Sequence, residues 1–163
     1  MLNKLFIFTV LLTVMAGCKS KSNAALKYNQ DIVDEQQSFQ DQGQVAEDNI
    51  SRYYDAGHYD SIGVAGAEME IILQKVIDNV KALPLPDAKG IDEFKKAAIE
   101  YFEFHKSYYT YCIEYGHAEN DDKRNEAMGR IEQFRGQRQD AENKIHQAQQ
   151  KFADANGFKM GKR

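Results

Sequence analysis

Apolar and aromatic residues recur at alternating intervals of three and four across segment 91–115, and this spacing constrains the fold more than any other feature of the sequence. Such spacing places its members along one stripe of an α-helix, the stripe by which the helices of a bundle pack together. The members of this seam are Ile91, Phe94, Ala98, Tyr101, His105, Tyr108, Cys112 and Tyr115. The segment therefore predicts a long helix with one face in a bundle core.

Three further segments repeat the spacing. The seam predicted for 120–157 contains Ile131, Phe134, Arg138, Ala141, Ile145, Ala148, Phe152 and Ala155. The seam predicted for 60–83 contains Ile62, Ala65, Met69, Ile72, Val76, Val80 and Leu83. The weaker seam of 25–55 contains Ala25, Ile32, Gln36, Phe39, Gly43, Ala46, Ile50 and Tyr53. From Ala24 onward the chain therefore reads almost entirely as helix.

Helix-breaking residues separate these segments. Pro84 and Pro86 lack the amide proton, and each disfavours helical geometry in the residue before it. Asp55-Ala56-Gly57-His58 closes the first helix, and Gly116 closes the third. Each break therefore falls between two predicted seams.

Capping residues and short connections complete the prediction. Asp60 or Ser61 is expected to cap the second helix, and Asn120 the fourth. Short links between long helices imply antiparallel neighbours. The sequence therefore predicts an all-α, up-down-up-down four-helix bundle over 25–158, with helices at about 25–55, 60–83, 90–115 and 120–157.

The N-terminus has the pattern of a secretory leader. In residues 1–17, Lys4 supplies the positive region, Leu5 to Val14 form an apolar core, and Ala16-Gly17 is a small-residue cleavage site. The uncharged run is shorter than the roughly 20 residues that span a bilayer. Met15-Ala16-Gly17-Cys18 is typical of the site at which bacterial lipoproteins are cut and acylated. An ordinary leader with Cys18 near the cut by chance is the alternative.

Acylation of Cys18 predicts where the protein resides. Cys18 would become the first residue of the mature chain and carry diacylglycerol and a palmitate-type chain, with 18–24 as a short tether and 159–163 as a basic tail. The partner expected from this is a membrane, bound through the N-terminal lipid. Lys19 is not the Asp that retains lipoproteins in the inner membrane of enterobacteria, which predicts the outer membrane. Lys19-Ser20-Lys21-Ser22 is not an acidic export tag, so exposure to the medium or to the periplasm stays open.

Charge and cysteine content narrow the partners further. The chain has a formal net charge of −4, and loss of Lys4 with the leader makes it more negative. This sign argues against nucleic acid, which calls for a basic patch. Once Cys18 is lipidated, Cys112 has no partner for a disulfide, and its seam position predicts a buried thiol.

Three polar residues occupy predicted core positions on three helices: Gln36, His105 and Arg138. A buried polar group must be hydrogen-bonded or neutralised. One interpretation is a polar layer that fixes the register of the bundle. The other is a cavity for a small anionic or aromatic ligand, with Arg138 as its charge. The walls of that cavity would be Tyr101, Tyr108 and Cys112.

Aromatic residues crowd segment 101–115, and they cannot all face one seam. Phe104 and Tyr111 lie a heptad apart and off the seam, so they are a candidate contact face for a protein partner. The alternative is that the first or the fourth helix covers them.

Motifs of catalysis are missing from the sequence. It has no glycine-rich phosphate loop, no Gly-x-Ser-x-Gly and no Cys-x-x-Cys. Glu114-x-x-His117 has the spacing found in di-iron bundles, but such a site needs a second copy and two further Glu residues. Glu142 and His146 are spaced as a solvated helical pair. We therefore expect no catalytic residue, no metal and no cofactor, and no enzymatic activity.

Short stretches along the mature chain resemble a known group of proteins. Tyr28-Asn29, Phe102-Glu103-Phe104-His105-Lys106-Ser107, Gln150-Lys151-Phe152-Ala153 and Asn156-Gly157-Phe158 are similar to a family of uncharacterised surface lipoproteins of spirochaetes and Bacteroidetes. The resemblance covers about residues 26–160, and His105 stands where the family pattern has Tyr. It implies an exported lipoprotein with a small helical domain and no assigned activity. The expected function is a binding or interaction module of the envelope, whose partner is an envelope protein or a small ligand. The alternative is a ligand-binding bundle with a polar core site around Arg138 and His105.

Overall fold

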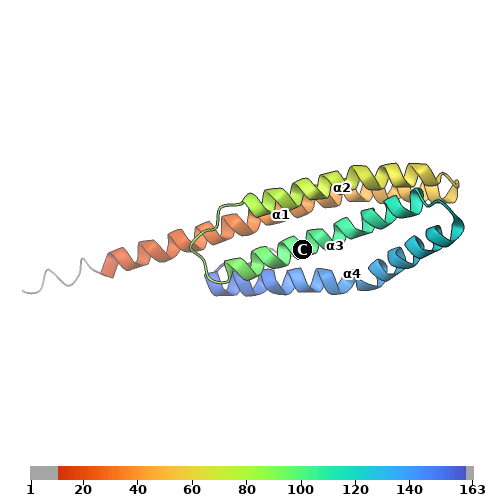
Figure 1. The fold of residues 1–163 in the computed structure, drawn as a ribbon. Coiled ribbons are helices and arrows are strands. Elements are labelled where there is room, and N and C mark those ends of the chain that lie inside the picture. The colour runs from red at the N-terminus through yellow and green to blue at the C-terminus, as the bar shows by residue number, and fades with distance from the viewer. Residues whose placement is uncertain (1–10, 161–163) are drawn as a thin grey trace, which may run out of the picture.

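The protein is an antiparallel bundle of four α-helices (Figure 1). A computed structural model describes the backbone of residues 11–160 and the side chains of residues 21–160. The helices are α1 (Leu11–Asp55), α2 (Tyr59–Ala82), α3 (Ile91–Gly116) and α4 (Asp121–Asn156), and the described part contains no strand. The predicted all-α four-helix architecture is confirmed.

Helix α1 differs from its predicted bounds because it begins at Leu11 and passes through the expected tether at 18–24. The stretch contains no proline and several good helix formers, so nothing in its sequence ends the helix. Residues 1–10 of the predicted leader lie outside the described residues, as does the side chain of Cys18. In Figure 1, α1 runs on past the end of the other three helices.

The predicted seams of α1 and α3 form the core. The buried members from α3 are Phe94, Ala98, Tyr101, His105, Tyr108, Cys112 and Tyr115. Those from α1 are Ala25, Ile32, Gln36, Phe39, Gly43, Ala46 and Ile50. Ile91 and Tyr53, at the ends of the two predicted seams, are half-buried, and α1 also buries Tyr28 and Asn29. Three-and-four spacing thus identified most of the buried stripe of both helices.

In α2, the predicted seam residues Ala65, Ile72 and Leu83 are only half-buried. Helices α2 and α3 also bury residues outside their predicted seams. Leu73 and Ile77 of α2, and Phe102 and Tyr109 of α3, are also fully buried. α2 has neighbours on two sides, α1 and α3, and one heptad stripe covers only one of them. The result is a wider apolar face on α2 than the sequence pattern indicated.

Helix α4 departs from its predicted seam at two positions. Arg138 and Ala155 are exposed, whereas Ala153 is buried. α4 packs mainly on α3 and makes little contact with α1. A side chain on the α4 seam that lies between α1 and α4, such as Arg138, is therefore exposed to solvent. Figure 1 also shows that α4 bends along its length.

Of the two N-caps predicted from the sequence, the one of α4 is confirmed and the one of α2 is wrong. Asn120 caps α4 as predicted, since its Oδ1 accepts from the amide of Lys123 at 2.9 Å. The N-cap of α2 is His58, not Asp60 or Ser61, and it makes no side-chain capping bond. Gly57 takes a φ of 70° in the preceding turn, which places the break earlier than the capping prediction did.

The described helices were also compared with the requirements for spanning a bilayer. None of them in residues 11–160 combines the length and the hydropathy needed to cross a membrane.

Candidate functional site

A cavity of about 460 Å³ opens between α1 and α4, toward the end of the bundle that carries the α1–α2 turn. Its floor is apolar and comes from the buried side chains of Tyr108 and Cys112 on α3 and Ile131 and Phe134 on α4. The cavity exists because α1 and α4 hardly touch, so the α3 core is not covered there. Ligand pockets of proteins fall in this range of volume and are lined mainly by such side chains.

The floor of the cavity is uncharged at neutral pH. Burial raises the pKa of the Cys112 thiol to about 12, against a smaller opposing effect of the hydrogen bond with Tyr108. Burial also raises the pKa of Tyr108. Because the thiolate is the nucleophilic form of cysteine, a thiol with so high a pKa is unreactive. The prediction that Cys112 is buried and free is confirmed.

Arg138 reaches the cavity but is not a core residue, which corrects the sequence prediction. Its side chain is 48% exposed, and it lies between Glu142 (Nε–Oε1, 3.1 Å) and Glu47 (Nη1–Oε2, 3.9 Å). Partial burial acts to lower the pKa of Arg138, but Glu47 and Glu142 outweigh it and hold that pKa above its ordinary value. The charge of Arg138 is therefore already balanced by the protein.

Gln36 and His105 are buried as predicted, but the structure does not join them to Arg138 in one layer. Gln36 Nε2 donates to the Tyr101 hydroxyl at 3.5 Å, and the Tyr101 ring packs edge-on against His105 at 4.5 Å. His105 is only 5% exposed, and its Nε2 has no hydrogen-bond partner within the described residues. Burial, aided by the nearby charge of Arg138, lowers the pKa of His105 to about 4. His105 is thus a neutral ring within an aromatic core.

Tyr101, which was expected in the wall of the Arg138 cavity, lies elsewhere. It lines a separate cavity of about 400 Å³ between α3 and α4, next to Phe104 and Lys144. The structure therefore brings Tyr108, Cys112 and Arg138 to one cavity, and places Tyr101 at another.

Sequence reasoning missed Arg135, which lines the mouth of the α1–α4 cavity. Its positive charge acts on Tyr108 and Cys112, where it opposes the rise in their pKa. Arg135 forms no ion pair with any described residue, and neither does Glu132 one turn earlier. The seam position of Ile131 could have indicated Arg135, because residues four apart share a helix face. Among the described residues, the mouth therefore offers one cation without an ion pair, Arg135, and two carboxylates without one, Asp48 and Glu132, beside an apolar floor.

Phe104 and Tyr111 do not form an open face. Phe104 is half-buried and stacks on Phe134 of α4 at 4.4 Å between ring centroids. Tyr111 is half-buried too, and the Arg130 guanidinium lies 5.7 Å from its ring centroid. This geometry favours the alternative in which the fourth helix covers them.

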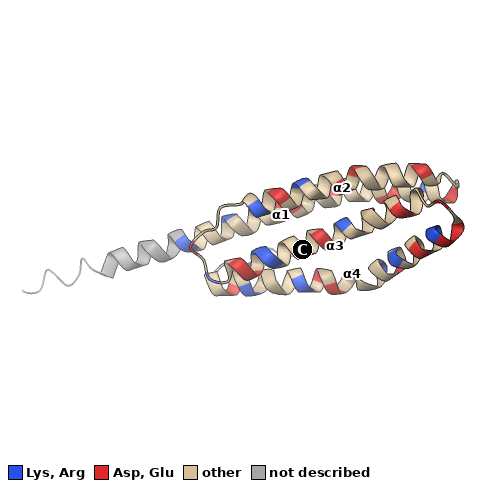
Figure 2. Cartoon of the chain, viewed as in Figure 1, with Lys and Arg blue, Asp and Glu red and all other residues tan. Residues whose placement is uncertain are grey.

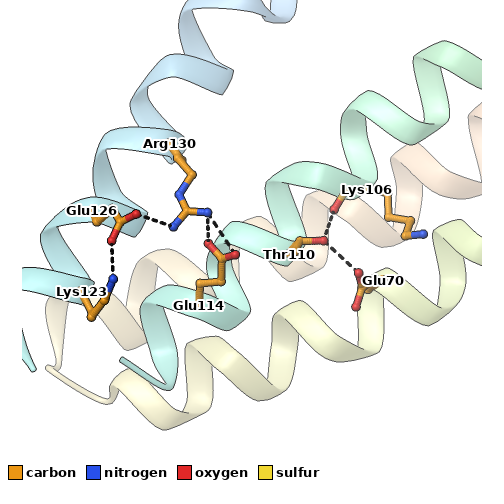
Figure 3. Close-up of polar contacts among 7 residues, drawn as sticks. All are labelled: Glu70, Lys106, Thr110, Glu114, Lys123, Glu126 and Arg130. Carbon is orange, nitrogen blue, oxygen red and sulfur yellow. Dashed lines mark hydrogen bonds and ion pairs between the residues drawn. The ribbon is translucent and has the colours of Figure 1, made fainter. Parts of the chain in front are cut away.

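Arg130 is held in place by carboxylates from two helices (Figure 3). It pairs with Glu114 of α3 at 2.9 Å and with Glu126 of α4 at 3.3 Å. On the same side of α3, the Thr110 hydroxyl donates to Glu70 of α2 at 2.8 Å. Polar contacts thus join α3 to both of its neighbours over this face.

The Glu114-x-x-His117 pair does not converge on one point. Glu114 is engaged by Arg130, whereas His117 packs over Gly63 with its Nδ1 3.9 Å from Asp60. Over the described residues, no three His, Cys, Asp or Glu side chains are placed to hold a metal ion.

The chain was compared with known proteins by three routes. No protein-family model, no curated protein and no solved structure matches it. The class of the protein is therefore defined by its own fold and site: an all-α four-helix bundle with a cavity between its first and last helices.

Proposed function

We propose that the protein is a lipid-anchored lipoprotein of the bacterial outer membrane, whose bundle is a binding or interaction module. The observation that carries this proposal is the leader pattern of residues 1–17, which ends at Cys18. The course of α1 is compatible with an anchor at that position. Cys18 lies on the part of α1 that precedes Ala25, the first buried residue of the described side chains. At 1.5 Å per residue, this separation is about 10 Å along the helix axis.

That separation matters because the acyl chains need room. A lipid on Cys18 would lie outside the core, so acylation and removal of residues 1–17 leave every described buried side chain in place. Anchoring by two or more chains is stable, whereas one chain binds only marginally. The proposal assigns the bundle no catalytic role.

The test is incorporation of a labelled fatty acid in a bacterial host, with mass spectrometry of the mature N-terminal peptide. We expect label on Cys18, loss of label in Cys18→Ser, and release of that variant from the membrane fraction. Cys112→Ser is the matched control, because it removes the other cysteine and must keep the label. An unmodified Cys18 at the mature N-terminus contradicts the proposal.

A second candidate function is the binding of a small ligand in the α1–α4 cavity. The observation that favours it is the apolar floor beside Arg135, whose charge no described carboxylate neutralises. Such a site suits a small aromatic or aliphatic carboxylate, with its body on Tyr108 and Phe134. In this assignment the cation that binds the carboxylate of the ligand is Arg135, and not Arg138 as the sequence predicted.

Thermal shift with a panel of such carboxylates tests the second candidate. A ligand that raises the Tm of the wild type should lose most of that effect in Arg135→Gln. Arg138→Gln is the matched control on the same helix, and it should keep the effect. If no member of the panel shifts the wild type, or if both variants behave alike, the cavity is not this site.

A further inference from the structure

The outer face of α2, which points away from α1 and α3, carries exposed aliphatic side chains. Ile71 is 72% exposed, and Val64, two turns earlier, is 54% exposed. Because residues seven apart lie on one stripe of a helix, these two side chains share a face. Helices α3 and α4, whose side chains are all described, have no exposed large apolar side chain. The outer face of α2 therefore differs from theirs.

No helix within residues 21–160 covers this face. α2 packs on α1 and α3, and it runs along one edge of the bundle (Figure 1). Val45 of α1 is 61% exposed and lies one turn from Asn49, which lines the groove between α1 and α2 together with Val64. One exposed aliphatic residue is ordinary on a protein surface. Three of them on adjoining stripes of two neighbouring helices form a small apolar surface.

Two charged residues flank Ile71 on the same stripe. Glu68 lies three residues before it and Lys75 four residues after it, and both side chains are exposed. Among the described residues, neither side chain has an ion-pair or hydrogen-bond partner. The other two charges of the stripe, Asp60 and Asp78, lie eleven residues before Ile71 and seven after it. The centre of the face therefore consists of Ile71 between one unpaired anion and one unpaired cation, and Figure 2 shows charges of both signs along α2.

This arrangement of charges is complementary to itself in an antiparallel pair. If the Ile71 side chains of two copies meet on a two-fold axis, Glu68 of each copy lies within about 1.5 Å, along the helix axis, of Lys75 of the other. A two-fold axis makes the same ion pair twice. Two copies packed parallel would place Glu68 beside Glu68 and Lys75 beside Lys75, and like charges repel. The Asp78 carboxylates stay about 21 Å apart in the antiparallel pair, so they do not oppose it.

We propose that the outer face of α2 is the contact between two copies of this chain, packed antiparallel with Ile71 on the two-fold axis. The exposed aliphatic area supplies the attraction, and the Glu68–Lys75 pairs select the antiparallel arrangement over the parallel one. A contact made by one helix of each copy buries less than the roughly 1,200 Å² of standard interfaces, so the dimer is weak and reversible.

The two N-termini lie at opposite ends of such a pair, because the copies are antiparallel. Two copies anchored at Cys18 in one membrane would therefore pair with their long axes along that membrane, and a chain that stands upright is a monomer. The contact itself does not depend on the lipid, so it can be measured on the chain without its anchor.

Sedimentation equilibrium tests the contact. The protein is residues 18–163 with Cys18→Ser, which keeps every buried side chain of the described bundle. We expect a monomer–dimer equilibrium at concentrations up to about 1 mM, the range of weak contacts. Ile71→Gln should abolish the dimer and leave the Tm of the monomer unchanged, because this side chain is exposed in the monomer. Glu68→Lys should raise the dissociation constant about tenfold, because each of the two ion pairs becomes a pair of like charges.

The swapped variant Glu68→Lys/Lys75→Glu restores both ion pairs and should dimerise as the parent does. Glu132→Lys is the matched control, because it makes the same charge change at an exposed, unpaired acid of α4, and it should leave the dimer unchanged. A monomer throughout the concentration range overturns the proposal, and so does a dimer that Ile71→Gln leaves intact. A swapped variant that dimerises no better than Glu68→Lys contradicts the antiparallel contact.

Discussion

The backbones of Gly63 in α2 and Gly116 in α3 are in direct contact: a Cβ built on Gly116 would lie 2.3 Å from the Gly63 amide nitrogen. A Cβ on Gly66, one turn further along α2, would lie 2.9 Å from the carbonyl oxygen of Tyr109. Contacts this short leave no space for a side chain. The absence of side chains therefore sets how closely α2 and α3 approach.

Replacing Gly116 with alanine should destabilise the bundle. The added methyl group has backbone on its far side, which cannot rotate away, so the two helices must separate. Overpacking of this kind costs about 1 to 3 kcal/mol, measured as a lower free energy of unfolding in urea. Gly129→Ala is the control, because nothing lies within 4 Å of its Cβ position. That variant should gain about 0.5 to 1 kcal/mol from helix propensity, and equal effects in the two variants would contradict the close contact.

His105 should make the stability of the protein depend on pH. Burial lowers its folded-state pKa to about 4, below the ordinary value of 6.5, so the unfolded chain binds the proton more readily. The stability contributed by the neutral ring is complete above pH 6.5 and is lost as the pH falls toward 4. The loss approaches about 3 kcal/mol.

His105→Phe is the test of that dependence. Phenylalanine suits the site because Phe39, Tyr101 and Phe134 surround the ring. Urea unfolding of both proteins should show a steeper loss of stability in the wild type between about pH 6.5 and pH 5. Carboxylates titrate in both proteins, so the difference isolates His105, and parallel curves would argue that the ring reaches solvent.

Cys112 should be inert in the folded protein. Its pKa of about 12, against 9.0 ordinarily, lowers the thiolate fraction at neutral pH about a thousandfold. In Cys18→Ser, which has one thiol, reaction with a disulfide reagent should proceed only as fast as the bundle opens and should become rapid in denaturant. Rapid labelling under native conditions would show that the α1–α4 cavity admits the reagent to the thiol.

Arg138→Leu should change the free energy of unfolding by less than about 1 kcal/mol, because exposed ion pairs contribute little. Phe134→Ala, one turn away, should cost about 3 to 5 kcal/mol, because that ring is buried against Phe104 and Tyr108. The contrast is measured in one urea series. A large loss from Arg138→Leu would place its charge in the core after all.

Hydrophobic spacing predicted the four helices and most of the buried stripes of α1 and α3. α3 and α1 obey the heptad stripe, and Cys112 and His105 are buried as their positions predict. Arg138 does not, because α4 makes few contacts with α1 and the Arg138 side chain is exposed between them beside Glu47, and the distance between two helices is not encoded in the spacing of either. Gly63 and Gly116 are a similar case. In the sequence, a glycine within a helix indicates only a low helix propensity, and the close contact between the two backbones is visible only in the structure.

The residues of the α1–α4 cavity could be predicted only in part from the spacing of the sequence. Arg138 occupies a predicted seam position, so the sequence indicated it as a candidate site residue. Arg135 lies off the predicted seam, so the sequence contained no such indication. Their roles are decided by partners on other helices: Glu47 and Glu142 neutralise Arg138, and no described carboxylate does so for Arg135. The N-terminal extension of α1 was missed for a different reason, because processing signals and helix propensity are separate properties of one stretch.

The unbroken course of α1 determines how far the opening of the α1–α4 cavity lies from Cys18 along the helix axis. From Cys18 to Asp48, which lines the mouth of the cavity, the helix rises by about 45 Å at 1.5 Å per residue. In a chain tethered at Cys18 and standing upright, that opening is further from the bilayer surface than the hydrocarbon layer is thick. In such a chain, a ligand of the α1–α4 cavity would reach the opening from the aqueous compartment and not directly from the bilayer.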